Sequence, residues 1–247
     1  MIKRILLLVP VFLFLTVSVA AAPSASPSPT PIDLAKTASS GSLPLQVVVL
    51  LTLLSFIPAI LISMTCFTRL IVVFHFLRQA LGTQEAPNNQ VLIGLSLFLT
   101  LFVMSPALSR INNEAIQPMV NGQISQTEAV TRALEPMRAY MLKHTRERDL
   151  ALFIQLSGSA RPNSPEEVPT SALIPAYMIS ELKTAFQIGF VLFLPFLVID
   201  MAVSSVLLSM GMMQLPPVVV SMPLKLLLFV MVDGWYLIVG SLVKSVM

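Results

Sequence analysis

Charged side chains are scarce in this sequence, and their scarcity is the first constraint on its class. Of its 247 residues, 11% are charged and 55% are hydrophobic, whereas an average soluble domain is about 25% charged. A soluble fold of this length could not hide so much apolar surface from water. We therefore expect a protein whose surface is covered by lipid hydrocarbon or by large contacts with other subunits.

Cysteine and histidine are also nearly absent, which removes most metal and redox chemistry. The single cysteine, Cys66, cannot form an internal disulfide and lies in an apolar run, where it serves as a small hydrophobic side chain. The two histidines, His75 and His144, are far apart and form no zinc-binding pattern with it. The formal net charge is only +3, with no basic stripe for nucleic acid. No phosphate-binding loop or nucleophile elbow occurs either, so we expect no metal, no cofactor and no catalytic residue.

The first 22 residues have the pattern of a cleavable signal peptide. Lys3 and Arg4 precede an apolar core that runs from Ile5 to Val19, and small residues around Ala20 suit the cleavage enzyme. An uncleaved anchor helix is the alternative, although the core is short for a membrane span. The next residues, 23–43, are rich in proline and serine and predict a flexible arm.

Four long apolar stretches predict an all-α membrane protein built from two helical hairpins. Pro58 should kink the first helix, and Gly211 with two following prolines should form the turn of the second hairpin. The predicted segments are a first hairpin over 44–109, with helices over about 45–79 and 91–104, and a second hairpin over 173–247, with helices over about 173–210 and 218–246.

Residues 110–172 differ from both hairpins because they carry balanced charges and apolar residues at helical spacing. They predict an insertion of short amphipathic helices. Removal of a signal peptide leaves the new N-terminus outside the cytoplasm, and two crossings then return the chain to the same side. We therefore expect this insertion on the periplasmic side of a bacterial inner membrane.

Charged residues inside the apolar stretches are the strongest functional signals, because an ion in hydrocarbon needs a partner, protein cover or water. Glu181 and Lys225 lie near the starts of the third and fourth helices, so a pair across helices or subunits is the simplest arrangement. Interfacial charges that reach water are the alternative. Asp200 and Asp233 either bind neighbouring helices, Asp200 through Ser204 and Ser205, or belong to a proton relay. We interpret Asp200, Asp233 and Arg69 as buried structural groups.

Methionines gather at the predicted turn of the second hairpin: Met210, Met212 and Met213 flank Gly211. Methionine is flexible and polarizable, so a ring of such side chains could close a pore and still deform around a passing chain. Ordinary filling of gaps at a helix turn is the alternative.

Several blocks of the sequence resemble one family, the FliP/SctR proteins of type III export gates. The most specific are PAYMISELKTAFQIGF (175–190), PFLVIDMAVSSVLLSMGMM (195–213) and KLLLFVMVDGW (225–235), and the similarity runs from about residue 44 to the C-terminus. The flagellar members are more similar overall than the injectisome members. The resemblance implies a non-enzymatic, all-α subunit in the inner membrane at the flagellar basal body.

The resemblance also implies partners and site residues. About five copies assemble with FliQ- and FliR-type subunits into a helical gate that reaches the periplasmic side, next to FlhA- and FlhB-type proteins, and unfolded flagellar proteins pass through it. Met210, Met212 and Met213 would form the gasket of the channel, with Gln214 where the family commonly has a further methionine. Glu181 and Lys225 would form the charged pair needed for assembly.

A small-solute or proton transporter that uses Glu181, Asp200 and Asp233 is the competing interpretation. It predicts internal inverted repeats, and none is evident in the sequence. A membrane enzyme is disfavoured because the sequence contains no constellation of nucleophile, base and oxyanion donors.

Overall fold

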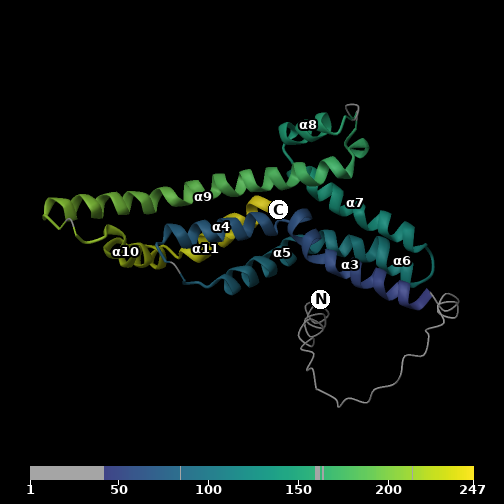
Figure 1. The fold of residues 1–247 in the computed structure, drawn as a ribbon, viewed down its shortest axis with the longest axis horizontal. Coiled ribbons are helices and arrows are strands. Elements are labelled where there is room, and N and C mark those ends of the chain that lie inside the picture. Colours follow the sequence, from purple (N-terminus) through teal and green to yellow (C-terminus); the bar gives the residue numbers. More distant parts are fainter. Residues whose placement is uncertain (1–41, 84, 159–161, 163, 213) are drawn as a thin grey trace, which may run out of the picture. The chain divides into compact units, whose positions relative to one another are not determined.

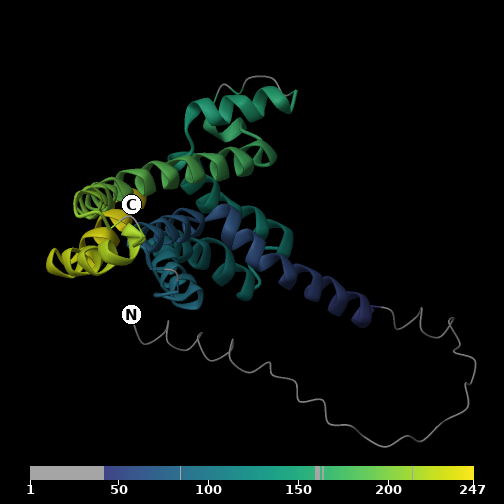
Figure 2. The same ribbon diagram turned by 60° about the vertical axis from the view of Figure 1, so that its left-hand side comes forward.

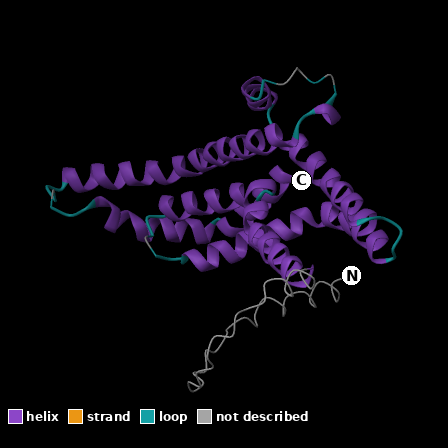
Figure 3. Ribbon diagram, turned by 45° about the vertical axis from the view of Figure 1, so that its right-hand side comes forward, coloured by secondary structure: helices purple, strands orange, loops and turns teal. Residues whose placement is uncertain are grey.

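The computed structural model describes residues 42–247, apart from 84, 159–161, 163 and 213 (Figure 1). Within these residues every regular element is a helix, which confirms the all-α class (Figure 3). The predicted signal peptide, 1–22, and residues 23–41 of the predicted arm lie outside the described part. The chain divides into two compact units, 1–51 and 52–247, and the packing described below is that of the second.

The first apolar segment is two helices joined by a sharp bend. α3 (Ser42–Met64) continues through Pro58, and α4 (Phe67–Ala80) follows at 67° to the end of α3. Pro58 therefore does not end the helix, and the sharp bend lies further along the chain, between Met64 and Phe67. The break lies where the Thr65 and Thr68 hydroxyls donate to main-chain carbonyls at the end of α3. Side-chain donors thus take the place of main-chain N–H groups and let the helix turn.

The second apolar segment is longer than predicted. Asn88 starts it, because its Oδ1 accepts from the Val91 N–H at 2.9 Å, as a helix N-cap does. The helix does not end near Met104 but continues through Pro106, which removes one hydrogen bond without stopping a helix that its neighbours support. The elements are α5 (Asn89–Ile111), the π-helical turn η2 (Asn112–Ile116) and α6 (Gln117–Val120).

The insertion contains the expected short helices. They are α7 (Gln126–His144), α8 (Glu147–Leu156) and the 3-10 turn η3 (Pro165–Glu167). Met141 of α7 is fully buried and packs with Tyr177 and Leu173, near the start of the long helix that follows the insertion. The insertion therefore has a small core of its own, shared with that helix.

The third apolar segment is α9 (Thr170–Ser209), close to the predicted 173–210. The fourth is divided into α10 (Pro217–Met231) and α11 (Gly234–Val246), which meet at a 67° bend. Asp233 lies at this bend with a left-handed backbone, φ 53°, and is exposed. The expectation of a buried Asp233 is therefore wrong. A carboxylate is buried only with partners to stabilise it, and the bend leaves this one at the surface.

α9 organises the second unit. Its first half lies beside α7 and α8, α4 packs along its middle, and its last turns reach α10 (Figures 1 and 2). α4 and α9 approach closely because Gly189 has no side chain. A Cβ atom there would lie 2.5 Å from the Phe76 ring, closer than atoms tolerate. Buried apolar residues of α4, α5, α9, α10 and α11 then form one continuous core.

Several segments have the length and composition of membrane spans. Among the described residues these are 89–120 and 170–209, and each of the bent pairs α3–α4 and α10–α11 passes the same test as one broken span. Only 11% of the most apolar 18-residue stretch of α9 is buried within the chain. Most of its apolar surface is therefore left for lipid or for another subunit.

Candidate functional site

Four charged side chains of the apolar helices form two separate networks, one at each end of α4. At the start of α4, Arg69 binds Glu181 of α9 through both carboxylate oxygens, with Nε to Oε2 at 2.8 Å. Glu181 is 0% exposed. A bidentate contact between guanidinium and carboxylate satisfies both charges at once, which is what burial of an ion pair requires.

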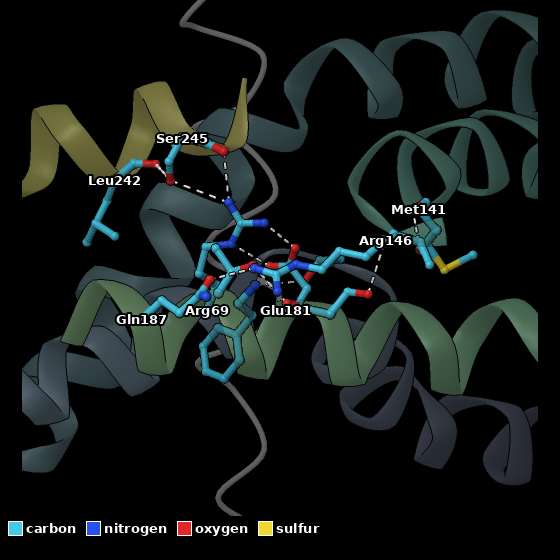
Figure 4. Close-up of polar contacts among 12 residues, drawn as sticks. Arg69, Met141, Arg146, Glu181, Gln187, Leu242 and Ser245 are labelled. Atoms are coloured by element: carbon cyan, nitrogen blue, oxygen red, sulfur yellow. Dashed lines mark hydrogen bonds and ion pairs between the residues drawn. The ribbon is translucent and has the colours of Figure 1, made fainter. Parts of the chain in front are cut away.

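The same arginine also holds the end of the C-terminal helix. Its Nη1 donates to the main-chain carbonyl of Ser245 in α11 at 2.8 Å. Figure 4 shows the guanidinium of Arg69 between Ser245 on one side and Glu181 on the other. One side chain therefore joins α4, α9 and α11, and a cation at the last turn of α11 is favoured by the helix dipole.

At the other end of α4, Lys225 of α10 makes a second three-helix connection. Its Nζ donates to Asp200 Oδ2 of α9 at 2.6 Å and to the carbonyl of Ala80, the last residue of α4, at 3.1 Å. The Ser221 hydroxyl donates to the other oxygen of Asp200 at 2.6 Å. Lys225 thus neutralises a carboxylate and caps the C-terminal end of a helix.

These networks correct the pairing expected from the sequence. Within one chain Glu181 does not pair with Lys225, because each of them is engaged by a different partner, Arg69 and Asp200. The two pairs lie 19 residues apart on α9, about 28 Å at 1.5 Å per residue, so one lysine cannot serve both carboxylates. A contact of either residue between subunits stays a prediction.

Asp200 binds a neighbouring helix, as the structural interpretation expected, but through another serine. The hydroxyl of Ser204 bonds only to the main-chain carbonyl of Asp200, whereas Ser221 of α10 reaches its carboxylate. The sequence could suggest that this carboxylate needs a partner but could not identify the helix that provides it.

The start of α8 is fixed to α9 by a relay through Ser180, which the sequence interpretation missed. The Ser180 hydroxyl accepts from the Arg146 main-chain N–H at 3.1 Å and donates to Asp149 Oδ2 at 2.8 Å. Arg146 is the N-cap of α8 and Asp149 its third residue, two positions that bind each other directly in a capping box. A hydroxyl from α9 stands between them here, so capping α8 and docking it on α9 are a single event.

The arginine of this relay adds further contacts to α9. Its Nη2 donates to Gln187 Oε1 at 2.6 Å and to the Thr184 hydroxyl at 3.3 Å (Figure 4). Residues 180, 184 and 187 share one face of α9, so Arg146 follows the helix for two turns. The only sequence signal was an acidic residue in the first turn of an amphipathic stretch, and it does not point to a serine 31 residues away.

The methionines predicted as a gasket lie in and before the turn that follows α9. Met210 and Met212 are 62% and 44% exposed, and Gly211 between them has φ 75°, a conformation that favours glycine. Met213 lies outside the described residues. The two described methionines therefore project from the end of a long helix and contribute little to the core of their own subunit.

Where α7 meets α9, buried polar groups lie together without making hydrogen bonds. The hydroxyls of Tyr140 and Tyr177 and the Nε2 atom of His144 have no hydrogen-bond partner among the described residues. Burial raises the pKa of Tyr140 above its usual range. Burial, and then the positive charges of Arg69 and Lys143, lower the pKa of His144 from 6.5 to about 4. His144 is therefore neutral at pH 7.

The arrangement provides no recognisable chemistry. Among the described residues no group of three or more His, Cys, Asp or Glu side chains could hold a metal ion. Glu181, which is buried, and Asp200, which is partly exposed, each bind a cation. The buried Asp149 binds the Ser180 hydroxyl, and Cys66 is fully buried. The four charged residues of the two networks thus hold helices together.

Comparison with known proteins gives one consistent result. The FliP family model matches residues 50–242. A flagellar biosynthetic protein FliP of Bacillus subtilis is 57% identical over 200 residues, which cover 81% of this chain and 90% of that protein. Those of Pectobacterium carotovorum and Cereibacter sphaeroides are 56% and 53% identical, over 83% and 82% of this chain and 80% and 67% of theirs.

Proposed function

Because this chain belongs to the FliP family, we propose that it is a non-enzymatic subunit of the flagellar protein export gate. About five copies, together with FliQ- and FliR-type subunits, would surround the channel for unfolded flagellar proteins. FlhA- and FlhB-type proteins would be its neighbours. The observation that carries the proposal is the family match over most of the chain.

The exposed apolar surface supports assembly. Val230, Met231 and Tyr236, at the end of α10 and the start of α11, are each more than 70% exposed, and Phe98 and Phe190 lie open on α5 and α9. A monomeric soluble protein rarely exposes apolar area of this extent. Subunit contacts and lipid together would cover it.

We also propose that Met210, Met212 and Met213 form the gasket of the channel. The exposure of the two described methionines supports this, because side chains that do not pack within their own subunit are available to contact the methionines of other subunits. Replacing Met212 and Met213 by alanine should raise leakage of small ions while export continues. Unchanged leakage with intact export would remove the gasket assignment, and Met178→Ala, in the first half of α9, is the matched control.

Lys225 and Asp200 would contribute to assembly indirectly, by holding α9 and α10 of one subunit together. Lys225→Glu should prevent assembly, and Asp200→Lys in the same chain should restore part of it, because these two residues are partners. Glu181→Lys should not rescue Lys225→Glu. Rescue by Glu181→Lys, and not by Asp200→Lys, would instead identify a direct contact between subunits.

The subunit would lie in the bacterial inner membrane at the flagellar basal body, with the insertion on the periplasmic side. A cysteine at exposed Glu135 of α7 tests this, because native Cys66 is fully buried. In intact cells an impermeant maleimide that crosses the outer membrane should label Glu135→Cys. Labelling only after lysis would place the insertion in the cytoplasm.

Co-expression with the neighbouring subunits tests the proposal as a whole. Extraction in mild detergent should give one discrete complex containing about five copies by native mass, and deletion of the gene should abolish motility and export. A lone monomer or dimer, with proton or solute transport that Asp200→Asn abolishes, would favour the transporter.

A further inference from the structure

His144 is the last residue of α7 and stands where three segments of the chain meet. Its ring packs on Tyr140, with ring centroids 4.7 Å apart, and Tyr140 packs on Tyr177 of α9. Its Nε2 atom is buried and has no hydrogen-bond partner among the described residues. A neutral imidazole tolerates this position at moderate cost, whereas an imidazolium there would lack an acceptor for one of its two N–H groups.

The charges around His144 are unfavourable to a second proton. Arg69 of α4 and Lys143 of α7 both act on the ring as cations. Glu181 of α9 does not balance them freely, since both of its oxygens are already bound by Arg69. At the end of α11 the carbonyl of Ser245 accepts from Arg69, and an oxygen of Met247, the last residue of the sequence, accepts from Lys143, so this terminal carboxylate is also engaged by a cation.

We propose that protonation of His144 is an acid switch that loosens the docking of α7 and α8 on α9. A proton on Nε2 places a third cation beside Arg69 and Lys143, in a site with no acceptor for it. The ring gains further hydration when the end of α7 moves away from α9. That movement pulls on Tyr140 and Met141, which hold the insertion against the start of α9. The inference rests on the fold alone and does not depend on the proposed function.

The direction of the effect follows from the two protonation states. In the docked form the pKa of His144 is about 4, and in a hydrated, loosened form it returns toward 6.5. The loosened form therefore binds more protons at any pH between these values, so docking weakens as pH falls through this window and is fully present above it. His144 keeps part of its contact with water, so we expect the docking equilibrium to weaken by about tenfold between pH 7 and pH 5.

Imidazole NMR of the purified full-length chain in detergent is the first test. The chain has two histidines, so His75→Gln leaves one labelled ring to titrate. His144 should titrate below pH 6, because docking holds its pKa below that of a solvated imidazole near 6.5. A titration at pH 6 or above would overturn the proposal, and this measurement needs no substitution at His144.

Distances between spin labels test the movement itself. Labels at the exposed positions Glu135→Cys of α7 and Lys183→Cys of α9, in a Cys66→Ala background, should give one narrow distance at pH 7 and a broader, longer distribution at pH 5. His144→Gln should keep the narrow distance at both values, and His144→Arg should give the broad one at pH 7. Equal broadening in wild type and His144→Gln, or none in either, would refute the switch.

Discussion

Removing Arg69 should cost more stability than removing any surface arginine of this chain. Arg69→Met leaves the Glu181 carboxylate buried without its cation and also frees the Ser245 carbonyl. Breaking a buried ion pair by deleting one partner costs about 3–5 kcal/mol of unfolding free energy. Glu181→Gln should cost less, about 1–3 kcal/mol, because the amide oxygen can still accept from the guanidinium.

The double variant separates the pair from its surroundings. Arg69→Met with Glu181→Met replaces both charges by apolar groups of similar length, and such a replacement is often close to neutral. We therefore expect it to be at least as stable as Arg69→Met alone, with a coupling energy of about 2 kcal/mol or more between the two sites.

Tryptophan fluorescence can follow unfolding, because Trp235 is the only tryptophan. Its ring lies 6.4 Å from that of Phe74 in α4 and 5.6 Å from that of Phe229 in α10, so it reports on the core. The matched control is Arg110→Met, which removes an exposed pair with Glu114 and should change stability by less than about 0.5 kcal/mol. Equal losses for Arg69→Met and Arg110→Met, or additive losses in the double variant, would refute the reasoning.

Three further substitutions have definite expected outcomes. Ser180→Ala should lower the unfolding free energy by about 1–3 kcal/mol and speed amide exchange mainly in α8; unchanged exchange there would contradict the shared cap. Gly189→Ala should destabilise by about 1–3 kcal/mol because its Cβ meets Phe76, and Phe76→Leu in the same chain should recover part of the loss, as a melting series would show. Lys225→Met should destabilise more than Lys225→Met with Asp200→Leu, and the reverse order would exclude the observed pair.

The sequence predicted the helices better than their breaks. Hydropathy identifies an apolar segment because membrane spans and buried helices need many apolar residues in a row. It cannot locate a bend that depends on a few side-chain hydrogen bonds, such as those of Thr65 and Thr68 at the end of α3. The break at Asp233 was missed for a similar reason, since nothing in the local composition marks a left-handed aspartate inside an apolar run.

The identity of the charged residues was predictable, but their partners were not. Glu181, Lys225, Asp200 and Arg69 were each expected to need a partner, because an isolated ion is too costly in an apolar environment. Which cation meets which carboxylate depends on the relative positions of α4, α9 and α10. That information lies in contacts between residues far apart in the sequence, 112 positions for Arg69 with Glu181 and 25 for Lys225 with Asp200.

The two ion pairs have a mechanical consequence. The first pair joins α4 directly to Glu181 of α9, and the second joins α9 at Asp200 to Lys225 of α10, which also binds the last carbonyl of α4. The part of α9 between residues 181 and 200 should therefore move together with α4 as one stiff unit. The last nine residues of α9, 201–209, extend about 14 Å beyond the second pair, at 1.5 Å per residue, and reach α10, with Leu207 buried. Met210 and Met212 are exposed just beyond the end of α9, on either side of Gly211. A chain that passes these methionines would therefore displace the turn at Gly211 and leave the part of α9 between the two ion pairs in place.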